Sequence, residues 1–196
     1  MKNLNSNNRL RFLSHWVARS RATCAVMRTS GLKGRYLALA IVAAVSTAAV
    51  ATALTPSSGV VSAVVFARAS FVDPTDVKIK VKGQSTEVIN VNNAQQTVIQ
   101  QIIIAPGGNT GWHSHPGPVV VLIKSGQMSL YDGDDPTCSA RTYTAGQAFV
   151  DSGQGHVHIA RNESQTQNLE LWATYLDVPA GAPFRLDAPN PGNCSF

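Results

Sequence analysis

The chain up to Ala67 contains no aspartate or glutamate, although it holds eight lysines and arginines. The part after Ala67 holds the other eight basic residues and all 11 acidic ones, so its formal charge is −3 while the whole chain is at +5. A basic chain of this kind is compatible with a nucleic-acid partner. The segregation of charge excludes that partner, because the later part is mildly acidic and has no basic stripe.

The basic leader is followed by an apolar run, Leu37 to Leu54, that has no charged residue. A basic segment, an apolar segment and a small-x-small site at Ala51-Thr52-Ala53 are typical of a secretory signal. The run is just long enough to span a bilayer as a helix, so an uncleaved membrane anchor is the alternative. We favour export with cleavage, because alanine contributes little hydrophobic burial. The protein is therefore expected to be secreted or extracytoplasmic, or else anchored by residues 37–54.

These features divide the chain into a basic leader over 1–36, a signal or anchor segment over 37–54, a linker over 55–67 and one folded domain over 68–196. The leader is long for a signal, and a true start at Met27 would give it a conventional length. The folded part is long enough for a single domain with one core.

Cysteine is scarce, with three residues in the chain, and Cys24 belongs to the leader. The folded part keeps Cys138 and Cys194, an even pair that indicates a disulfide bond in an exported protein. Such a bond would tie the C-terminal tail to an acidic loop and contribute about 4 kcal/mol in the chain-entropy model. Two unpaired buried thiols are the alternative. The absence of a CxxC spacing argues against a structural zinc site.

Helix signals are nearly absent after Ala67, whereas short β-branched or alternating runs recur between turn residues. About nine short strands predict a closed or double-sheet all-β fold. We expect the run Val119–Lys124 to be buried on both faces, and Pro106-Gly107-Gly108-Asn109 to break the strand before it. The expected strands are Val77–Val81, Thr86–Val91, Thr97–Ala105, Gly111–His115, Val119–Lys124, Gln127–Asp132, Gly146–Val150, His156–Asn162 and Leu169–Asp177.

Four of the five histidines form two His-x-His pairs, His113-Ser-His115 and His156-Val-His158, and the fifth, His15, lies in the leader. On a β-strand, this spacing directs both imidazoles of a pair to one face. Paired imidazoles suit Zn, Fe, Ni or Cu and are not needed for packing. Trp112 alternates with the first pair and should face away from it. The sequence has no Gly-x-Ser-x-Gly, P-loop or dinucleotide-binding pattern.

Two stretches resemble the two motifs of the cupin family. Gly111-Trp-His113-Ser-His115-Pro-Gly-Pro, followed by an apolar strand ending at Gly126, resembles the first motif. Gly146-Gln-Ala-Phe-Val150, followed by Gly153-Gln-Gly155-His-Val-His158-Ile-Ala-Arg-Asn162, resembles the second. The resemblance covers roughly 106–162 and implies a cupin-like jelly-roll β-barrel with a metal in its mouth, preceded here by the signal or anchor helix.

By position in these motifs, the resemblance implies that His113, His115 and His158 are the metal ligands. The spacing of His158 to Asn162 matches the second motif, so His156 is interpreted as a residue that supports the ligands or lines the pocket, with an additional ligand as the alternative. The family places a Glu ligand four residues after the second histidine, where this chain has Val119.

A three-histidine site is therefore expected, as in some thiol-oxidising cupins. Three neutral imidazoles leave a divalent metal at about +2, which would lower the pKa of bound water and favour anionic substrates. Glu170 is the other candidate for an additional ligand, although we prefer a solvent-facing position for it. The cofactor is expected to be one divalent transition metal ion: Fe, Mn, Ni, Zn or Cu.

The sequence supports three functions. The first is an exported or membrane-anchored metal-binding cupin that binds an unidentified small molecule at a His-ligated metal. The second is a metal-dependent oxygenase or lyase acting on a small organic acid or thiol, and the third is a non-catalytic structural or storage barrel. Fold does not decide among them, so whether the protein is an enzyme stays open. A homodimer is a further expectation, because many small cupins dimerise.

Overall fold

A computed structural model describes residues 53–82 and 86–196 of the chain. The basic leader, Met27 and all but the last two residues of the apolar run 37–54 lie outside these ranges. The expected signal or anchor helix therefore lies outside the described residues as well. Within the two ranges, the structure contains no helix with the length and hydropathy needed to cross a membrane.

The described residues form strands, turns and loops without an α-helix, which confirms the predicted all-β class. Runs rich in β-branched residues supply most of the strands, because their side chains pack well on a pleated surface. The strands are β1 (Ser58–Ser70), β2 (Val77–Lys82), β3 (Thr86–Val91), β4 (Gln96–Asn109), β5 (His113–Ser114), β6 (Val119–Ser125), β7 (Gln127–Asp132), β8 (Arg141–Thr144), β9 (Ala148–Asp151), β10 (His158–Arg161), β11 (Leu169–Val178) and β12 (Leu186–Asp187).

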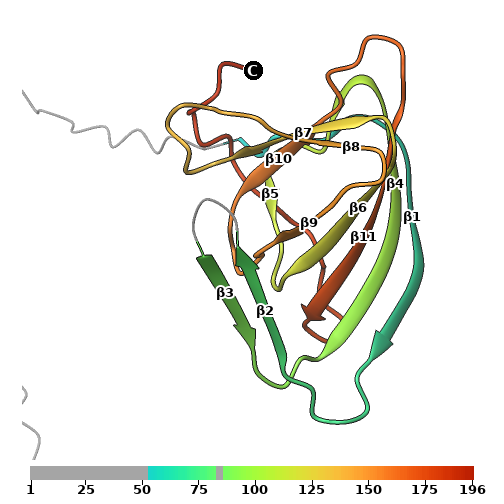
Figure 1. Ribbon diagram of the computed structural model, residues 1–196, viewed down its shortest axis with the longest axis vertical. Helices are drawn as coiled ribbons and strands as arrows, with labels where there is room; N and C mark the ends of the chain where they lie inside the picture. The colour runs from blue at the N-terminus through green and yellow to red at the C-terminus, as the bar shows by residue number, and fades with distance from the viewer. Residues whose placement is uncertain (1–52, 83–85) are drawn as a thin grey trace, which may run out of the picture. The chain divides into compact units, whose positions relative to one another are not determined.

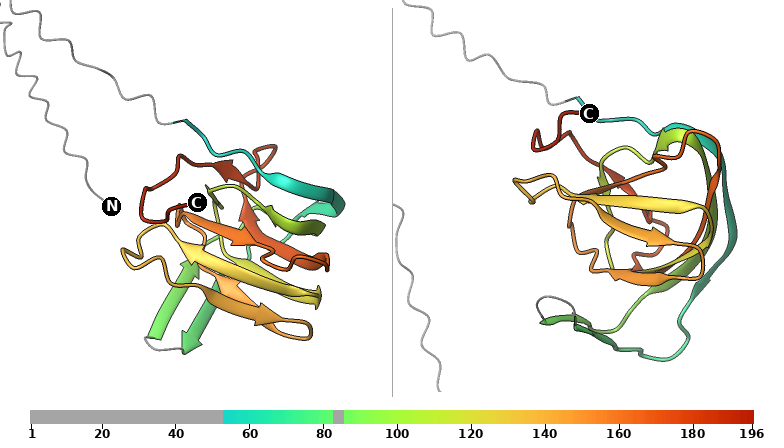
Figure 2. Two further views of the ribbon diagram at one scale, coloured as in Figure 1. Left: turned by 90° about the horizontal axis from the view of Figure 1, so that it is seen from above. Right: turned by 45° about the horizontal axis from the view of Figure 1, so that its top comes forward.

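Ten of these strands belong to one sheet, which curves into a nearly closed barrel (Figures 1 and 2). Its main path runs β12-β5-β10-β4-β11-β6-β9, with β1 added beside β4 and β7 joining β10 to β8. Strands β2 and β3 form a separate two-stranded hairpin. Curving a sheet into a barrel leaves fewer strand edges without a hydrogen-bonding partner.

The hydrophobic core lies inside the barrel, and strand β11 shows how the order of residues turns apolar side chains toward it. Its residues alternate between buried and half-buried positions, so that Leu169, Leu171, Ala173 and Tyr175 point inward. They pack with inward-facing residues of β4 and β6 in one cluster. Strand β6 also alternates, so the expectation that Val119–Lys124 is buried on both faces is wrong.

The structure differs from the expected boundaries in two further places. The segment 55–67 was expected as a linker, but β1 begins at Ser58 and pairs antiparallel with β4 over most of its length. The domain therefore starts before Arg68, and β1 lies alongside β4 in Figure 1. The segment Pro106–Asn109 does not end the strand as expected, because β4 continues to Asn109. The pairing with β1 is nevertheless irregular there, since Val60 lies opposite Ile104 and Ser58 opposite Asn109.

Candidate metal centre

The two motifs expected to carry the ligands meet inside the barrel. His113 lies on β5 and His158 on β10, and these two residues pair directly across antiparallel strands. His115 follows β5 immediately, before a turn through Pro116-Gly117-Pro118. Each of the three histidines is only 5% exposed, so all three imidazoles are held in the interior.

The three rings face one another closely. Their centroids are 4.5 Å apart for His113 and His158, 4.9 Å for His113 and His115, and 5.2 Å for His115 and His158. One ring nitrogen of each lies within 4.8 Å of those of the other two. This spacing is compatible with ligands that converge on one ion.

Backbone carbonyls fix which nitrogen is free. His113 Nδ1 lies 2.9 Å from the Gly111 carbonyl oxygen, and His115 Nδ1 lies 2.8 Å from the Phe184 carbonyl oxygen. A carbonyl only accepts, so both Nδ1 atoms carry the proton and both Nε2 atoms keep a lone pair. Metal-bound histidines commonly have their second nitrogen held in this way.

Burial keeps these imidazoles neutral. Desolvation lowers the pKa of His113 well below 6.5 and lowers the pKa of His115. Desolvation also lowers the pKa of His158 to about 4, although the neighbouring Asp151 acts to raise it. A metal binds only the neutral ring. The donor set therefore fits a divalent transition metal: three uncharged nitrogens are ready at neutral pH, and nitrogen donors suit Zn, Fe, Ni and Cu.

The histidines line a small cavity in the barrel. The space open to the centres of water-sized molecules is about 40 Å³, and one water needs about 10–15 Å³ by this measure. Burial raises the pKa of the Tyr175 phenol, so its hydroxyl stays protonated and donates to Gln100 Oε1 at 2.8 Å. The other lining residues are mostly apolar: Ile102, Val119, Val121, Met128, Leu130, Phe149, Ala160, Leu171 and Ala173, with Thr110 and Asp151.

Asp151, at the end of β9, is a site residue that the sequence analysis missed. Its Oδ1 lies 3.3 Å from His156 Nδ1 and 3.6 Å from His158 Nδ1. Burial alone would raise the pKa of Asp151, but the hydrogen bond from His156 and the charges of the histidines outweigh it, and the pKa is lowered. The same hydrogen bond to Asp151 raises the pKa of His156. His156 thus lies next to the three-histidine group, in a second group with Asp151 and His158.

Two glycines allow the segments around the site to approach one another. Gly153 has φ of +62°, and a Cβ there would overlap the backbone of Gly117. This contact brings the loop before His156 against the turn after His115. A residue with a side chain would force the two segments apart.

Glu170, the other candidate for an additional ligand, and Trp112 both have side chains that point away from the three-histidine group. The Glu170 carboxylate is on the outer face of β11, where it accepts hydrogen bonds from Gln101 Nε2 at 2.7 Å and Trp172 Nε1 at 3.0 Å. It belongs to neither group that could hold a metal among the described residues. Trp112 is 1% exposed and packs in a second core cluster with Tyr131, as its alternation with the histidines predicted.

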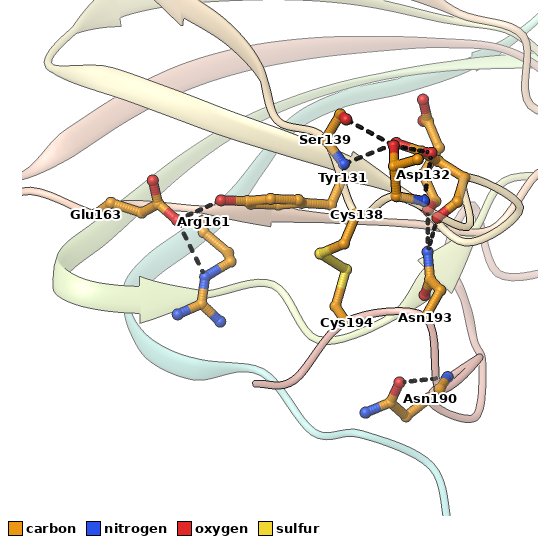
Figure 3. The surroundings of a disulfide bond; sticks show 12 residues. Tyr131, Asp132, Cys138, Ser139, Arg161, Glu163, Asn190, Asn193 and Cys194 are labelled. Atoms are coloured by element: carbon orange, nitrogen blue, oxygen red, sulfur yellow. Dashed lines mark hydrogen bonds and ion pairs between the residues drawn. A yellow bond between two sulfur atoms is a disulfide. The ribbon is translucent and has the colours of Figure 1, made fainter.

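The predicted disulfide between Cys138 and Cys194 is present (Figure 3). It fastens the C-terminal tail to the loop after β7. The side chain of Asn193 adds hydrogen bonds to the carbonyl oxygens of Asp132 and Asp135, at 2.8 and 2.6 Å. A buried disulfide is compatible with an extracytoplasmic location.

Comparison with known proteins gives a likeness of fold only. No family model matches the sequence, and no curated protein matches it. Among solved structures, the chain is similar to the cupin domain of an XRE-family transcriptional regulator from Enterobacter cloacae, with 23% identity, a TM-score of 0.34, and 42% of this chain and 82% of that one covered. A cupin domain from Bordetella pertussis matches at 20% identity with a TM-score of 0.37, covering 54% of this chain and 96% of that one.

An oxalate oxidase matches at 21% identity with a TM-score of 0.35, and the similarity spans 41% of each chain. A further similar structure is described as a cupin superfamily protein from Desulfitobacterium hafniense, with 10% identity, a TM-score of 0.35, and 51% of this chain and 75% of that one covered. The nearly closed β-barrel and its three-histidine group agree with what the two sequence motifs led us to expect.

Proposed function

We propose that this cupin-like barrel holds one divalent transition metal ion through His113, His115 and His158 and binds a small molecule beside it. The observation that carries the proposal is the convergence of three buried, neutral imidazoles, two of which have Nδ1 tied to a backbone carbonyl. Burying three imidazoles is costly for a fold unless all their nitrogens find partners, and three of them together are unnecessary for packing. A metal would offset that cost and use all three lone pairs.

The cavity next to the histidines favours a binding role over a purely structural one. A metal that only stiffened the barrel would need no space beside it, whereas this cavity has room for about three waters. A bound metal ion would supply Lewis acidity toward the oxygen atoms of a small ligand. The apolar walls would exclude bulk water, and Tyr175 and Thr110 would limit what can enter. An oxygenase or lyase acting on a very small organic acid or thiol is the second candidate.

We also propose that the protein works outside the cytoplasm. The disulfide between Cys138 and Cys194 supports this location, because such bonds persist in oxidising compartments. The mature N-terminus distinguishes the two modes of export. Mass spectrometry should find a chain beginning at Leu54 if the signal is cleaved after Ala53, and a chain that retains residues 37–54 if they are an anchor. The expected homodimer stays a prediction; exposed apolar residues of β1, such as Val61 and Phe66, would be covered in one.

The metal site is tested by titrating Zn²⁺ or Co²⁺ into metal-free protein and following the heat by calorimetry. The wild-type chain should bind one ion, and His113→Ala should lose most of its affinity because two imidazoles remain. Glu170→Gln is the matched control, since Glu170 lies on the outer face of β11, and it should bind as the wild type does. Equal affinity in wild type and His113→Ala would overturn the ligand assignment.

A further inference from the structure

A buried carboxylate lies beside the proposed ligands, and no part of the function proposed above uses it. Asp151 ends β9, its side chain is 5% exposed, and it lines the same cavity as the three histidines. Its partner across the antiparallel β6–β9 pair is Val119, an apolar residue of that cavity. An ionised carboxylate in such surroundings is costly unless other groups compensate its charge.

The contacts of Asp151 leave two buried atoms unpaired. Oδ1 lies 3.3 Å from His156 Nδ1 and 3.6 Å from His158 Nδ1. The second distance is longer than a hydrogen bond. Within the part of the chain that the structure describes, both Asp151 Oδ2 and His158 Nδ1 are buried without a hydrogen-bond partner. Buried polar atoms are nearly always satisfied, and the Asp151 carboxylate is the acceptor that lies near His158 Nδ1.

A series of charged groups connects Asp151 to the surface. His156 Nε2 lies 3.6 Å from Asp132 Oδ1 and 3.7 Å from Asp134 Oδ1. Asp132 in turn accepts from Arg141 at 2.7 Å. His156 therefore lies between two groups of carboxylates, with Asp151 hydrogen-bonded at Nδ1 and the surface carboxylates near Nε2. The Asp151 carboxylate thus contacts His156 as well as His158.

We propose that Asp151 is a positioning residue of the metal centre. Its carboxylate faces the Nδ1–H of His158 and orients that ring, so that the Nε2 atoms of all three ligating histidines point to one place. His156 in turn holds the Asp151 carboxylate in position. This inference rests on the proposed function. His113 and His115 use backbone carbonyls for the same purpose, and His158 is the member of the set without one. A carboxylate behind a ligating histidine orients the ring and raises its basicity as a donor. It also brings one negative charge to a centre whose ligands are neutral.

A second cation between Asp151, His156 and His158 is the competing assignment, because these three also form a group with metal-ligand spacing. A neutral imidazole has one lone pair, so His158 can serve only one of the two positions. An ion held by His113, His115 and His158 leaves Asp151 and His156 paired with each other. An ion held by Asp151, His156 and His158 would instead leave His113 and His115 without a metal. The observations favour a single ion with Asp151 behind His158.

The test compares Asp151→Asn with the wild-type full chain. Asparagine keeps the shape and removes the charge, and Asp73→Asn, at an exposed residue, is the control for the charge change itself. Affinity for Zn²⁺ is measured by competition with a chromophoric chelator, and Co²⁺ absorption spectra report the geometry of the ligands. We expect Asp151→Asn to weaken Zn²⁺ binding about 10–100-fold and to change the Co²⁺ spectrum, because outer partners of ligating histidines have effects of this size. His156→Asn should produce a smaller loss.

A readout without metal separates positioning from general instability. In the metal-free protein, the ring ¹⁵N shifts of His158 should change in Asp151→Asn and stay as they are in Asp73→Asn, while the melting temperature changes little. Zn²⁺ affinity within twofold of wild type, with unchanged Co²⁺ spectrum and ring shifts, would overturn the inference while leaving the three-histidine site intact. A stoichiometry of two bound ions per wild-type chain and one per Asp151→Asn chain would overturn the inference and favour a second cation site instead. A wild-type chain that binds no metal would overturn the proposed function and this inference with it.

Discussion

Removing the disulfide should lower the stability of the domain by a predictable amount. Cys138 and Cys194 are 56 residues apart, and closing a loop of that length contributes about 4 kcal/mol in the chain-entropy model. A domain of roughly 140 residues changes its melting temperature by about 3–4 °C per kcal/mol. A variant with Cys138→Ala and Cys194→Ala together should therefore melt about 12–16 °C below the wild type, as measured by circular dichroism.

A reducing agent supplies the matched control for this prediction. It should lower the melting temperature of the wild type to that of the double variant and leave the variant unchanged. The hydrogen bonds of Asn193 would still hold the tail loosely, so the folded barrel should survive with the disulfide absent. A difference of less than about 4 °C, or a wild type insensitive to reductant, would refute the reasoning that this bond restricts the unfolded chain.

Three other changes should have measurable effects. Gly153→Ala should cost about 3 kcal/mol or more in chemical denaturation, because φ is positive and the new Cβ would overlap Gly117; an unchanged midpoint would contradict this. Asn162→Ala should cost about 2–4 kcal/mol, because the Asn162 Nδ2 atom donates to two backbone carbonyls, one of them buried; a loss below about 1 kcal/mol would count against it. Burial and the hydrogen bond to Glu163 raise the pKa of Tyr131 to about 12. The stability that Tyr131 contributes is therefore complete below pH 10 and is lost between pH 10 and 12, because the unfolded chain loses the phenol proton first. In melting experiments Tyr131→Phe should not show this loss of stability at high pH, and an equal loss in the variant would contradict the reasoning.

The sequence predicted those elements whose signal is local. Short runs between turn residues located β3 and β7 at their observed bounds, and the alternation of apolar and basic residues located β2 to within one residue. The sequence does not predict strand β1, because its small and apolar residues follow the apolar run directly and have the composition of a linker. It pairs with β4, from Ser70 opposite Gln96 to Ser58 opposite Asn109, so the partner that makes it a strand lies beyond the β2–β3 hairpin and is not visible locally.

The same distinction applies to the site. The spacing within each motif placed His113, His115 and His158, and the alternation of β11 was enough to direct Glu170 outward once Leu169 and Leu171 were placed inward. Asp151 was missed because nothing in its own segment marks it. Its position depends on pairing with Val119 across β6 and β9. Val119 stands where the cupin motif has a glutamate, so the first motif supplies no negative charge to the centre. Asp151, opposite Val119 on the neighbouring strand, brings one instead, and only the register of the sheet reveals this relation.

The most direct test of the central claim is elemental analysis of the protein purified under native conditions without chelators. The account predicts close to one transition metal ion per chain in the wild type, and loss of that ion in His113→Ala and in His158→Ala, with Glu170→Gln retaining it. A metal-free wild type that also fails to take up Zn²⁺ or Co²⁺, or full retention of the ion in the histidine variants, would contradict it.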